Sequence, residues 1–276
     1  MDRVKGKVAF ITGAARGMGR SHAIRLAEEG ADIIAVDLMQ PIESVAYELS
    51  GQEDLAETVA LVEKTGQRIV SRQADVRSQS DLDRAVAEGL EAFGHIDIVC
   101  ANAGIASFAV TWEMPEDTWQ EMLDINLSGA WHTAKAAVPA MIEAGRGGSI
   151  VLVSSVAGLK GIPNIAHYSA AKHGLVGLMR TLANELAPHR IRVNTVHPTN
   201  VATPMVINDT TFRAFRPDLP DPSEEDSLEA MTLMNAIPVP WVDPVDVSNA
   251  VLWLGSDESR YVTGVALPID AGMTIK

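Results

Sequence analysis

The sequence predicts an α/β fold, built as a doubly wound parallel sheet of about seven strands with helices on both faces. Short apolar runs rich in β-branched residues alternate with amphipathic segments of helical length along the chain, which is the pattern of βαβ units. The chain has 276 residues and 47% apolar composition, which is enough for one sizeable core. We therefore expect a single domain over residues 1–276.

The first apolar run, residues 8–11, enters the turn TGAARGMG at residues 12–19, and an amphipathic helix follows. Such a helix directs backbone N–H groups and a partial positive charge at whatever lies above the turn, which suits a pyrophosphate. Gly13, Gly17 and Gly19 allow the tight turn and the close backbone approach. A glycine cluster alone can be a structural turn, but strand, turn and helix in this order indicate a Rossmann-type dinucleotide site.

The second strand, residues 31–37, ends in Asp37. A carboxylate at this point accepts hydrogen bonds from the ribose hydroxyls of NAD and repels a 2′-phosphate, so the sequence favours NAD over NADP. Arg16 in the glycine turn argues the other way, because an arginine can hold a 2′-phosphate, yet Leu38 offers no second cation. The alternative for Asp37 is a plain residue at a strand end.

Residues 38–50 are longer than a tight strand-to-helix connection needs, which predicts an insertion beside the adenosine end of the cofactor. The insertion either covers the nucleotide or is a surface excursion. The remaining elements are expected as helices at 53–64, 80–93 and 243–255, a long helix ending near 187, and strands at 68–74, 96–101, 149–154, 192–196 and 264–269.

Small or polar residues come directly after two of these strands. Asp75-Val76 is placed after the third strand, where Asp75 either contacts the adenine amino group or caps the next segment of the chain. Asn102-Ala103-Gly104 ends the fourth strand with side chains small enough for a flat ring or a ribose to approach. Both turns are therefore expected to line the cofactor site.

Tyr168 and Lys172 lie four residues apart, so a helix places them on one face. An ammonium beside a phenol favours the phenolate and lowers its pKa, which predicts a proton-transfer pair. Ser155 ends an apolar strand, where its hydroxyl can bond a substrate oxygen. Asn126, amid apolar helical residues, is either a satisfied structural amide or, as we prefer, the holder of an ordered water. The alternative for the pair is a core tyrosine with a solvated lysine.

Residues 199–241 are too long for a plain connector and mix apolar side chains with acids and prolines. We expect a mobile apolar lid over the substrate, with Thr203 near the cofactor; a dimer contact or a partly disordered loop is the alternative. On the long helix, small residues opposite Tyr168 allow close packing of a helix from a second subunit. These residues are Ala166, Ala170, Gly177 and Thr181.

The formal charge of −14, from 36 acidic and 22 basic residues, argues against nucleic acid or an anionic membrane as partner. The lone Cys100 cannot form an internal disulfide, which fits a reducing compartment. No secretory h-region and no apolar span of membrane length appear, so a cytoplasmic protein is expected. The histidines, including His167 and His173, lack metal-ligand spacing, so no metal is expected.

As a set, these motifs resemble the short-chain dehydrogenase/reductase family, and the resemblance covers nearly the whole chain. Within that family, the 38–50 insertion and the run HPTNVATPM at residues 197–205 resemble the carveol-dehydrogenase-like, mycofactocin-coupled subgroup. The matching pieces are Thr12-Gly-x-x-x-Gly17-x-Gly19, Asp75-Val76, Asn102-Ala103-Gly104, Asn126, Ser155 and Tyr168-x-x-x-Lys172.

The resemblance implies a homotetramer that reversibly oxidises a secondary alcohol to a ketone. It assigns the acid/base role to Tyr168 and the orientation of the substrate oxygen to Ser155. By the same resemblance, Lys172 holds the nicotinamide ribose and lowers the pKa of the tyrosine, and Asn126 places a relay water. The expected cofactor contacts are Gly13, Arg16, Gly17, Met18, Gly19, Asp37, Leu38, Asp75, Val76, Asn102, Ala103, Gly104, Tyr168, Lys172, Pro198, Val201 and Thr203.

Three functions compete. The leading hypothesis is an NAD-dependent dehydrogenase of a small apolar cyclic or terpenoid alcohol, carveol-like, because the lid is apolar. The subgroup further implies that NAD stays bound and is reoxidised by an external redox carrier. An NADPH-dependent 3-oxoacyl or general ketoreductase is opposed by Asp37. A non-catalytic NAD-sensing protein is expected to lack part of the Ser155, Tyr168 and Lys172 set, which this chain has complete.

Overall fold

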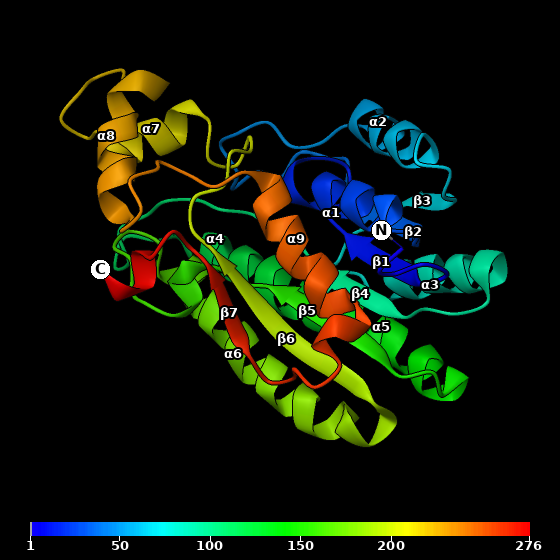
Figure 1. Cartoon of the computed structure of the whole chain (residues 1–276). Coiled ribbons are helices and arrows are strands. Elements are labelled where there is room, and N and C mark those ends of the chain that lie inside the picture. The colour runs from blue at the N-terminus through cyan, green and yellow to red at the C-terminus, as the bar shows by residue number, and fades with distance from the viewer. Residues whose placement is uncertain (1) are drawn as a thin grey trace.

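The structure, a computed structural model, describes residues 2–276. In that range seven strands form one parallel sheet in the order β3-β2-β1-β4-β5-β6-β7, with helices on both faces (Figure 1). The predicted fold class is confirmed. The strands are β1 Val8–Thr12, β2 Asp32–Asp37, β3 Ile69–Gln73, β4 Ile98–Ala101, β5 Gly148–Val153, β6 Ile191–Pro198 and β7 Ala266–Ile269.

The core lies in two layers, one on each face of the sheet, because neighbouring residues of a strand point to opposite faces. Phe10 packs in the layer under α3, α5 and α6, whereas Ile11 packs in the layer under α1 and α9. The helices are α1 Gly17–Glu28, α2 Gln52–Glu63, α3 Gln79–Phe93, α4 Glu116–Leu123, α5 Gly129–Ala144, α6 Ala166–Leu186, α7 Asp209–Phe215, α8 Glu224–Met234 and α9 Pro244–Gly255.

The strand order reverses direction between β1 and β4. In an open parallel sheet, the crevice outside the carboxyl ends of the strands at such a reversal is the usual place of a ligand site. The turns after β1, β2, β4 and β5 all open at this edge. The sheet thus brings together segments that are far apart in the sequence.

Two segments depart from regular structure beside this edge. Residues 38–51 form neither helix nor strand and connect β2 to α2. The chain between α4 and α5 forms a π-helical turn at Asp124–Ser128, which contains Asn126. Single π-turns inside helices are frequent at functional sites. Asn126 therefore lies in a local irregularity and not in the plain helix that we expected.

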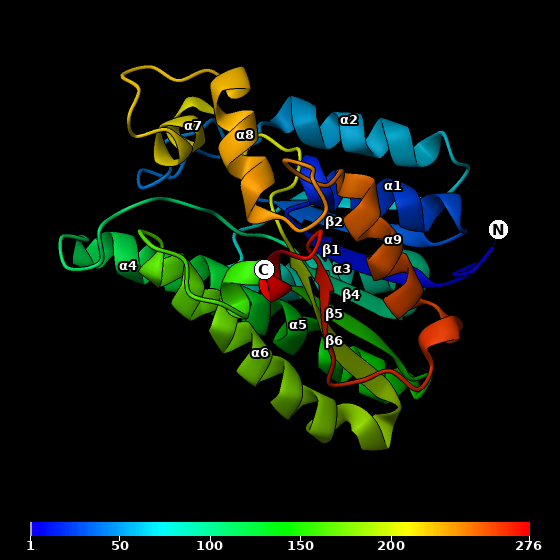
Figure 2. The ribbon, with the colours of Figure 1, turned by 60° about the vertical axis from the view of Figure 1, so that its left-hand side comes forward.

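The predicted lid, residues 199–241, contains α7 and α8. Both helices lie beyond the carboxyl ends of the strands, above the end of the sheet that carries the crevice (Figure 2). Phe212 of α7 and Met231 of α8 are buried, so these two helices pack on each other and on the body of the protein. No helix within residues 2–276 is long and apolar enough to cross a membrane.

Candidate active site

The glycine turn after β1 has the geometry that its sequence predicted. Gly13 has a φ of +67°, and a Cβ there would lie 2.8 Å from the Cα of Ala103, so this position accepts glycine alone. A Cβ on Gly19 would lie 1.9 Å from the carbonyl oxygen of Gly13. Gly19 thus lets the first turn of α1 pack directly on the glycine loop.

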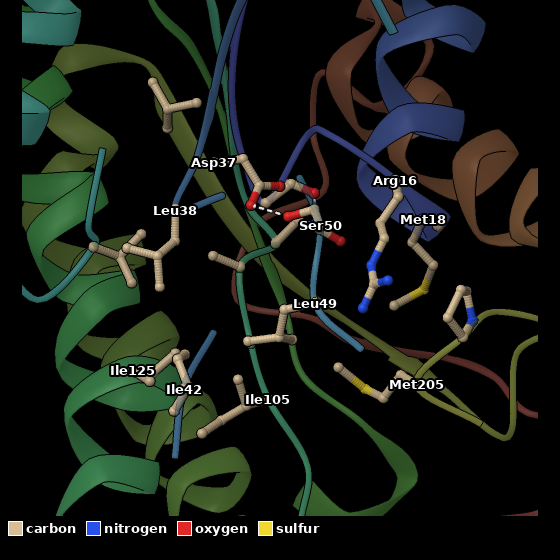
Figure 3. A pocket seen from close by; sticks show the side chains of 18 of the residues that line it. Arg16, Met18, Asp37, Leu38, Ile42, Leu49, Ser50, Ile105, Ile125 and Met205 are labelled. Carbon is tan, nitrogen blue, oxygen red and sulfur yellow. Dashed lines mark hydrogen bonds between the residues drawn. The ribbon is translucent and has the colours of Figure 1, made fainter. Parts of the chain in front are cut away.

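A cavity opens at the crevice, and Figure 3 shows side chains that line it. Its walls come from the glycine turn, the ends of β2, β3 and β4, the 38–50 segment and the start of the lid. Twelve of the predicted cofactor residues line it: Gly13, Arg16, Gly17, Met18, Asp37, Leu38, Asp75, Val76, Asn102, Ala103, Gly104 and Thr203.

Five predicted cofactor contacts are not in the cavity wall of the described chain: Gly19, Tyr168, Lys172, Pro198 and Val201. Gly19 serves the packing of α1, and its contact with the cofactor stays a prediction. Pro198 is the last residue of β6 and pairs with Ile269, and Val201 is buried and bridges to Val242.

Eleven lining residues were not predicted, and five of them belong to the 38–50 segment. The sequence does carry a signal for the residues in this segment: nearly every second or third position of the loop is apolar or aromatic, and a solvated loop does not need such side chains. The unpredicted lining residues are Val36, Gln40, Ile42, Tyr47, Leu49, Ser50, Ala74, Ile105, Ile125, Pro204 and Met205.

Asp37 stands at the end of β2 and faces the cavity, with Ser50 beside it (Figure 3). Its Oδ2 accepts the backbone N–H of Ala15 at 2.9 Å, and its Oδ1 accepts the hydroxyl of Ser50 at 2.7 Å. The guanidinium of Arg16 donates to the carbonyl oxygen of Glu48. The 38–50 segment therefore holds both side chains that the sequence linked to the choice between NAD and NADP.

The segment also reaches the far wall of the cavity. The hydroxyl of Tyr47 accepts the backbone N–H of Ala106 at 3.2 Å, and the hydroxyl of Ser44 donates to the carboxylate of Glu121 at 2.6 Å. Burial raises the pKa of Tyr47 to about 12. The segment thus crosses the crevice from β2 to the loop after β4.

The residues of the cavity fit a dinucleotide. Asn102 donates its amide to the carbonyl oxygens of Thr12 at 3.0 Å and of Gly13 at 3.1 Å. Its Oδ1 is buried and has no hydrogen-bond partner among residues 2–276, although buried polar atoms are nearly always bonded. A free acceptor, a carboxylate and a glycine cradle at a helix N-terminus are what ribose hydroxyls and a pyrophosphate require.

Lys172 is almost fully buried on α6. Its Nζ donates to the carbonyl oxygen of Val153 at 2.9 Å and lies 5.4 Å from the centre of the Tyr168 ring. The hydroxyl of Ser154 donates to the carbonyl oxygen of Lys172 at 2.9 Å. The end of β5 and the start of α6 are thus tied together, and Ser155 lies close enough to the phenol of Tyr168 to influence its pKa.

Gly104 joins this cluster to the cavity. A Cβ on Gly104 would lie 2.9 Å from Oδ1 of Asn126 and 3.6 Å from Nζ of Lys172. Asn126 bonds the backbone of Ile105 through both ends of its amide, at 2.8 Å each, and also the sulfur of Met122. The side chain is a satisfied structural amide, the alternative that we ranked second, and its role in holding a water stays a prediction.

Burial dominates the electrostatics of this cluster. It raises the pKa of Tyr168 above its ordinary value, and hydrogen bonding with Ser155 acts in the opposite direction. It lowers the pKa of Lys172 to about 8. The expected fall in the pKa of Tyr168 is not found in this structure, because loss of solvation disfavours the charged form of both groups and dominates both pKa values.

In the part of the chain that the structure describes, no three His, Cys, Asp or Glu side chains are grouped to hold a metal ion. His167 bonds the hydroxyl of Ser107 through Nε2 at 2.9 Å, and His173 bonds the carbonyl oxygen of Ser169 through Nδ1 at 2.9 Å. Each of the two contacts is internal to the fold.

Residues 7–214 match the model of a protein family described as short chain dehydrogenase. This chain belongs to the short-chain dehydrogenase family. It is 56% identical over 277 aligned positions to (−)-trans-carveol dehydrogenase of Rhodococcus erythropolis, with all of both chains covered. The family prediction, made from the glycine turn and the Ser155, Tyr168 and Lys172 set, is confirmed.

Solved structures of other family members superpose closely on this short-chain dehydrogenase. The crystal structure of carveol dehydrogenase from Mycobacterium avium in complex with NAD is 58% identical, covers 99% of each chain and gives a TM-score of 0.98. That of a short chain dehydrogenase from Mycobacterium paratuberculosis bound to NAD is 43% identical, covers 99% of this chain and 100% of its own, and gives a TM-score of 0.91.

Proposed function

We propose that this protein is an NAD-dependent dehydrogenase that interconverts a secondary alcohol and its ketone. The observation that carries the proposal is the junction at Gly104, where Lys172 and Asn126 of the catalytic cluster meet a cavity that fits a dinucleotide. Asp37 in that cavity opposes a 2′-phosphate. When bound, NAD supplies the hydride acceptor for alcohol oxidation.

The side chains of the cluster divide the acid-base work. The phenolate form of Tyr168 removes the proton of the substrate hydroxyl, and the Ser155 hydroxyl orients the same oxygen by a hydrogen bond. Lys172, held by the Val153 carbonyl, places a positive charge beside the phenol, and this charge favours the phenolate once it forms. In the direction of ketone reduction, the protonated Tyr168 returns the proton.

The proposed substrate is a small apolar cyclic or terpenoid alcohol, similar to carveol. Full-length identity of 56% to a carveol dehydrogenase supports this class. Met205, at the start of the lid, faces the cavity, and Phe212 of the lid is buried. Apolar walls bind an apolar ring well and lack partners for a charged substrate.

We also propose that NAD is retained between turnovers and that an external redox carrier reoxidises it in place. The 38–50 segment supports retention, because its bonds from Ser50 to Asp37 and from Tyr47 to Ala106 close over the cavity. Release of NAD then requires that both bonds break. A cytoplasmic location belongs to the same proposal and is supported by the lone, buried Cys100, which fits a reducing compartment.

A homotetramer is the proposed assembly. Ala170, Gly177 and Thr181 are exposed on α6, and a Cβ on Gly177 would meet no described atom within 4 Å. Small exposed residues in a row on a helix allow a second helix to pack closely. Light scattering coupled to size-exclusion chromatography measures the assembly, and a monomer at assay concentration would contradict it.

The proposed activity is tested by Tyr168→Phe. This variant should lose at least about 1,000-fold in kcat for carveol oxidation, because the ring remains but no group can take the proton. Its affinity for NAD, measured by isothermal titration, should change little. Retained turnover would remove Tyr168 from the mechanism. Mass spectrometry of the protein as purified, followed by exchange against isotope-labelled NAD, tests cofactor identity and retention.

The two competing functions predict other results. A 3-oxoacyl or general ketoreductase would bind NADPH more tightly than NADH, which titration of both cofactors measures directly. A non-catalytic NAD-sensing protein would bind NAD but turn over no alcohol in a substrate panel. The gathering of Ser155, Tyr168 and Lys172 next to Gly104, which lines the cavity, supports an enzyme.

A further inference from the structure

His197 lies near the carboxyl end of β6, and its side chain is fully buried. Its Nδ1 is 2.7 Å from the carbonyl oxygen of Ser155, and its Nε2 is 2.7 Å from the hydroxyl oxygen of Thr195. Thr195 is also fully buried and lies two residues earlier, so both side chains share one face of the sheet. A line of polar contacts therefore leads from β6 to the backbone of Ser155.

These contacts determine which nitrogen of His197 carries the proton. A carbonyl oxygen only accepts hydrogen bonds, so Nδ1 carries the proton and donates to Ser155. In a neutral imidazole Nε2 is then an acceptor, and the Thr195 hydroxyl donates to it. The Ser155 carbonyl thus selects the tautomer of His197, and the Thr195 hydroxyl adapts to it as a donor to the other ring nitrogen.

The surroundings keep the imidazole neutral. Burial lowers the pKa of His197 below its ordinary value, and the proximity of Lys172 and His173 on α6 acts in the same direction. Asp270, which follows β7, acts weakly in the opposite direction. At neutral pH the ring therefore has one N–H, and that N–H is committed to the Ser155 carbonyl.

The position of the Ser155 backbone matters because its hydroxyl influences Tyr168. Hydrogen bonding with Ser155 lowers the pKa of the phenol, against the effect of burial. Ser154, the preceding residue, is tied to α6 through the carbonyl oxygen of Lys172. The bond from His197 ties the next residue to β6. Loss of this second tie frees the backbone at the point that carries the Ser155 hydroxyl.

We propose that His197 is a positioning residue for catalysis. It holds the carbonyl of Ser155, with Thr195 anchoring the other ring nitrogen, so that the Ser155 hydroxyl meets both the phenol of Tyr168 and the substrate oxygen. This inference rests on the proposed function, because it concerns the same hydroxyl and phenol. The competing explanation is a purely structural histidine that joins a strand to a loop.

The full-length protein with NAD is assayed for carveol oxidation over a range of pH. His197→Ala should lower kcat by about 10- to 100-fold, because a catalytic group displaced by about 1 Å loses up to that factor. KM and the affinity for NAD should change less than about threefold. The limb of the kcat/KM profile on which activity rises as Tyr168 loses its proton should move up by about half to one pH unit, because the Ser155 bond no longer lowers the pKa of Tyr168.

Two further variants separate positioning from packing. His197→Asn places an amide N–H near the position of Nδ1 and should recover about tenfold in kcat over His197→Ala. Thr195→Val keeps the shape of the side chain but removes the donor to Nε2, so the imidazole loses one of the two hydrogen bonds that hold its ring in place. In Thr195→Val the kcat/KM profile should shift toward higher pH by less than in His197→Ala. If His197→Ala fails to fold, Thr195→Val still tests the proposal.

His22→Ala is the matched control. His22 is also fully buried, and its Nδ1 bonds the hydroxyl of Ser248 at 2.8 Å, between α1 and α9. It should lose stability without any alkaline shift. The positioning role is refuted if folded His197→Ala keeps the wild-type kcat and pH profile, if Asn is no better than Ala, or if His22→Ala shifts the profile equally.

The wild type and Tyr168→Phe distinguish failure of this inference from failure of the proposed function. A wild type that oxidises no alcohol overturns the proposed function, whereas turnover retained in Tyr168→Phe removes Tyr168 from the mechanism and overturns the inference. An inactive Tyr168→Phe beside a normal His197→Ala overturns the inference alone. An inactive Tyr168→Phe beside a slow, alkaline-shifted His197→Ala supports both.

Discussion

Replacement of Lys172 by Met tests how much the buried positive charge of Lys172 destabilises the folded protein. The Lys172 side chain is 4% exposed, and burial lowers its pKa from 10.5 to about 8. Met has a similar length, carries no charge and fits an apolar site. We expect Lys172→Met to abolish turnover and yet to stabilise the cofactor-free protein at neutral pH, as is common for residues kept for function.

The magnitude follows from the shift in pKa. A difference of about 2.5 units between the unfolded and folded chains corresponds to roughly 3 kcal/mol of destabilisation while Lys172 is charged in both. The lost hydrogen bond to the Val153 carbonyl offsets about 1 kcal/mol of the gain. The variant should therefore unfold with a free energy roughly 1 to 2 kcal/mol higher than the wild type at pH 7.

The pH dependence has a defined sign. Because the folded pKa lies below the unfolded one, the unfolded chain binds more protons between about pH 8 and about pH 10.5, and wild-type stability rises with pH there. Chemical denaturation of both proteins should show the wild type gaining roughly 2 kcal/mol on the variant between about pH 7 and about pH 9.5. A gap that stays constant with pH, or a variant less stable at every pH, would refute the electrostatic reasoning.

Three further predictions test other parts of the site. In the cofactor-free protein Tyr168 should titrate above the ordinary pKa of a tyrosine. Because the chain has three tyrosines, a spectrophotometric titration of wild type against Tyr168→Phe isolates the signal of Tyr168. A Tyr168 phenolate at neutral pH would contradict this prediction. Gly19→Ala should lower the free energy of unfolding, measured by thermal denaturation, by about 1 to 3 kcal/mol, because the new Cβ would overlap the Gly13 carbonyl. An unchanged melting temperature would disprove that contact. Asp37→Ser should reduce the preference for NAD over NADP by at least about tenfold in kcat/KM, as the charge that repels a 2′-phosphate is gone; an unchanged preference would assign the choice of cofactor to other residues.

The sheet and its order of elements could be predicted from the sequence because the pattern is local. Buried strands such as residues 98–101 are continuous apolar runs, and helices such as residues 79–93 show a one-sided apolar stripe. Element ends were less exact: β6 continues to Pro198 and pairs there with Ile269, two residues beyond the predicted strand. Pairing with a neighbour fixes a strand end, and neighbours are not visible in a single run of sequence.

The 38–50 segment could be predicted from the sequence only in part. Its length indicated an insertion, but the bonds from Ser50 to Asp37 and from Tyr47 to Ala106 depend on how the chain returns across the crevice. Asn126 is similar, because its amide bonds the backbone of a residue twenty-one positions away. Such contacts follow from the meeting of distant segments and leave no periodic signal in the sequence.

By itself, the sequence determined the fold class and the family and predicted the reacting side chains, because each depends on residue type and spacing along one strand or helix. Only the tertiary structure decided the electrostatic state of those side chains. The pKa values of Tyr168 and Lys172 depend on how much solvent the surrounding elements exclude. Spacing predicted the neighbour and its charge, but burial is a property of the whole packed molecule.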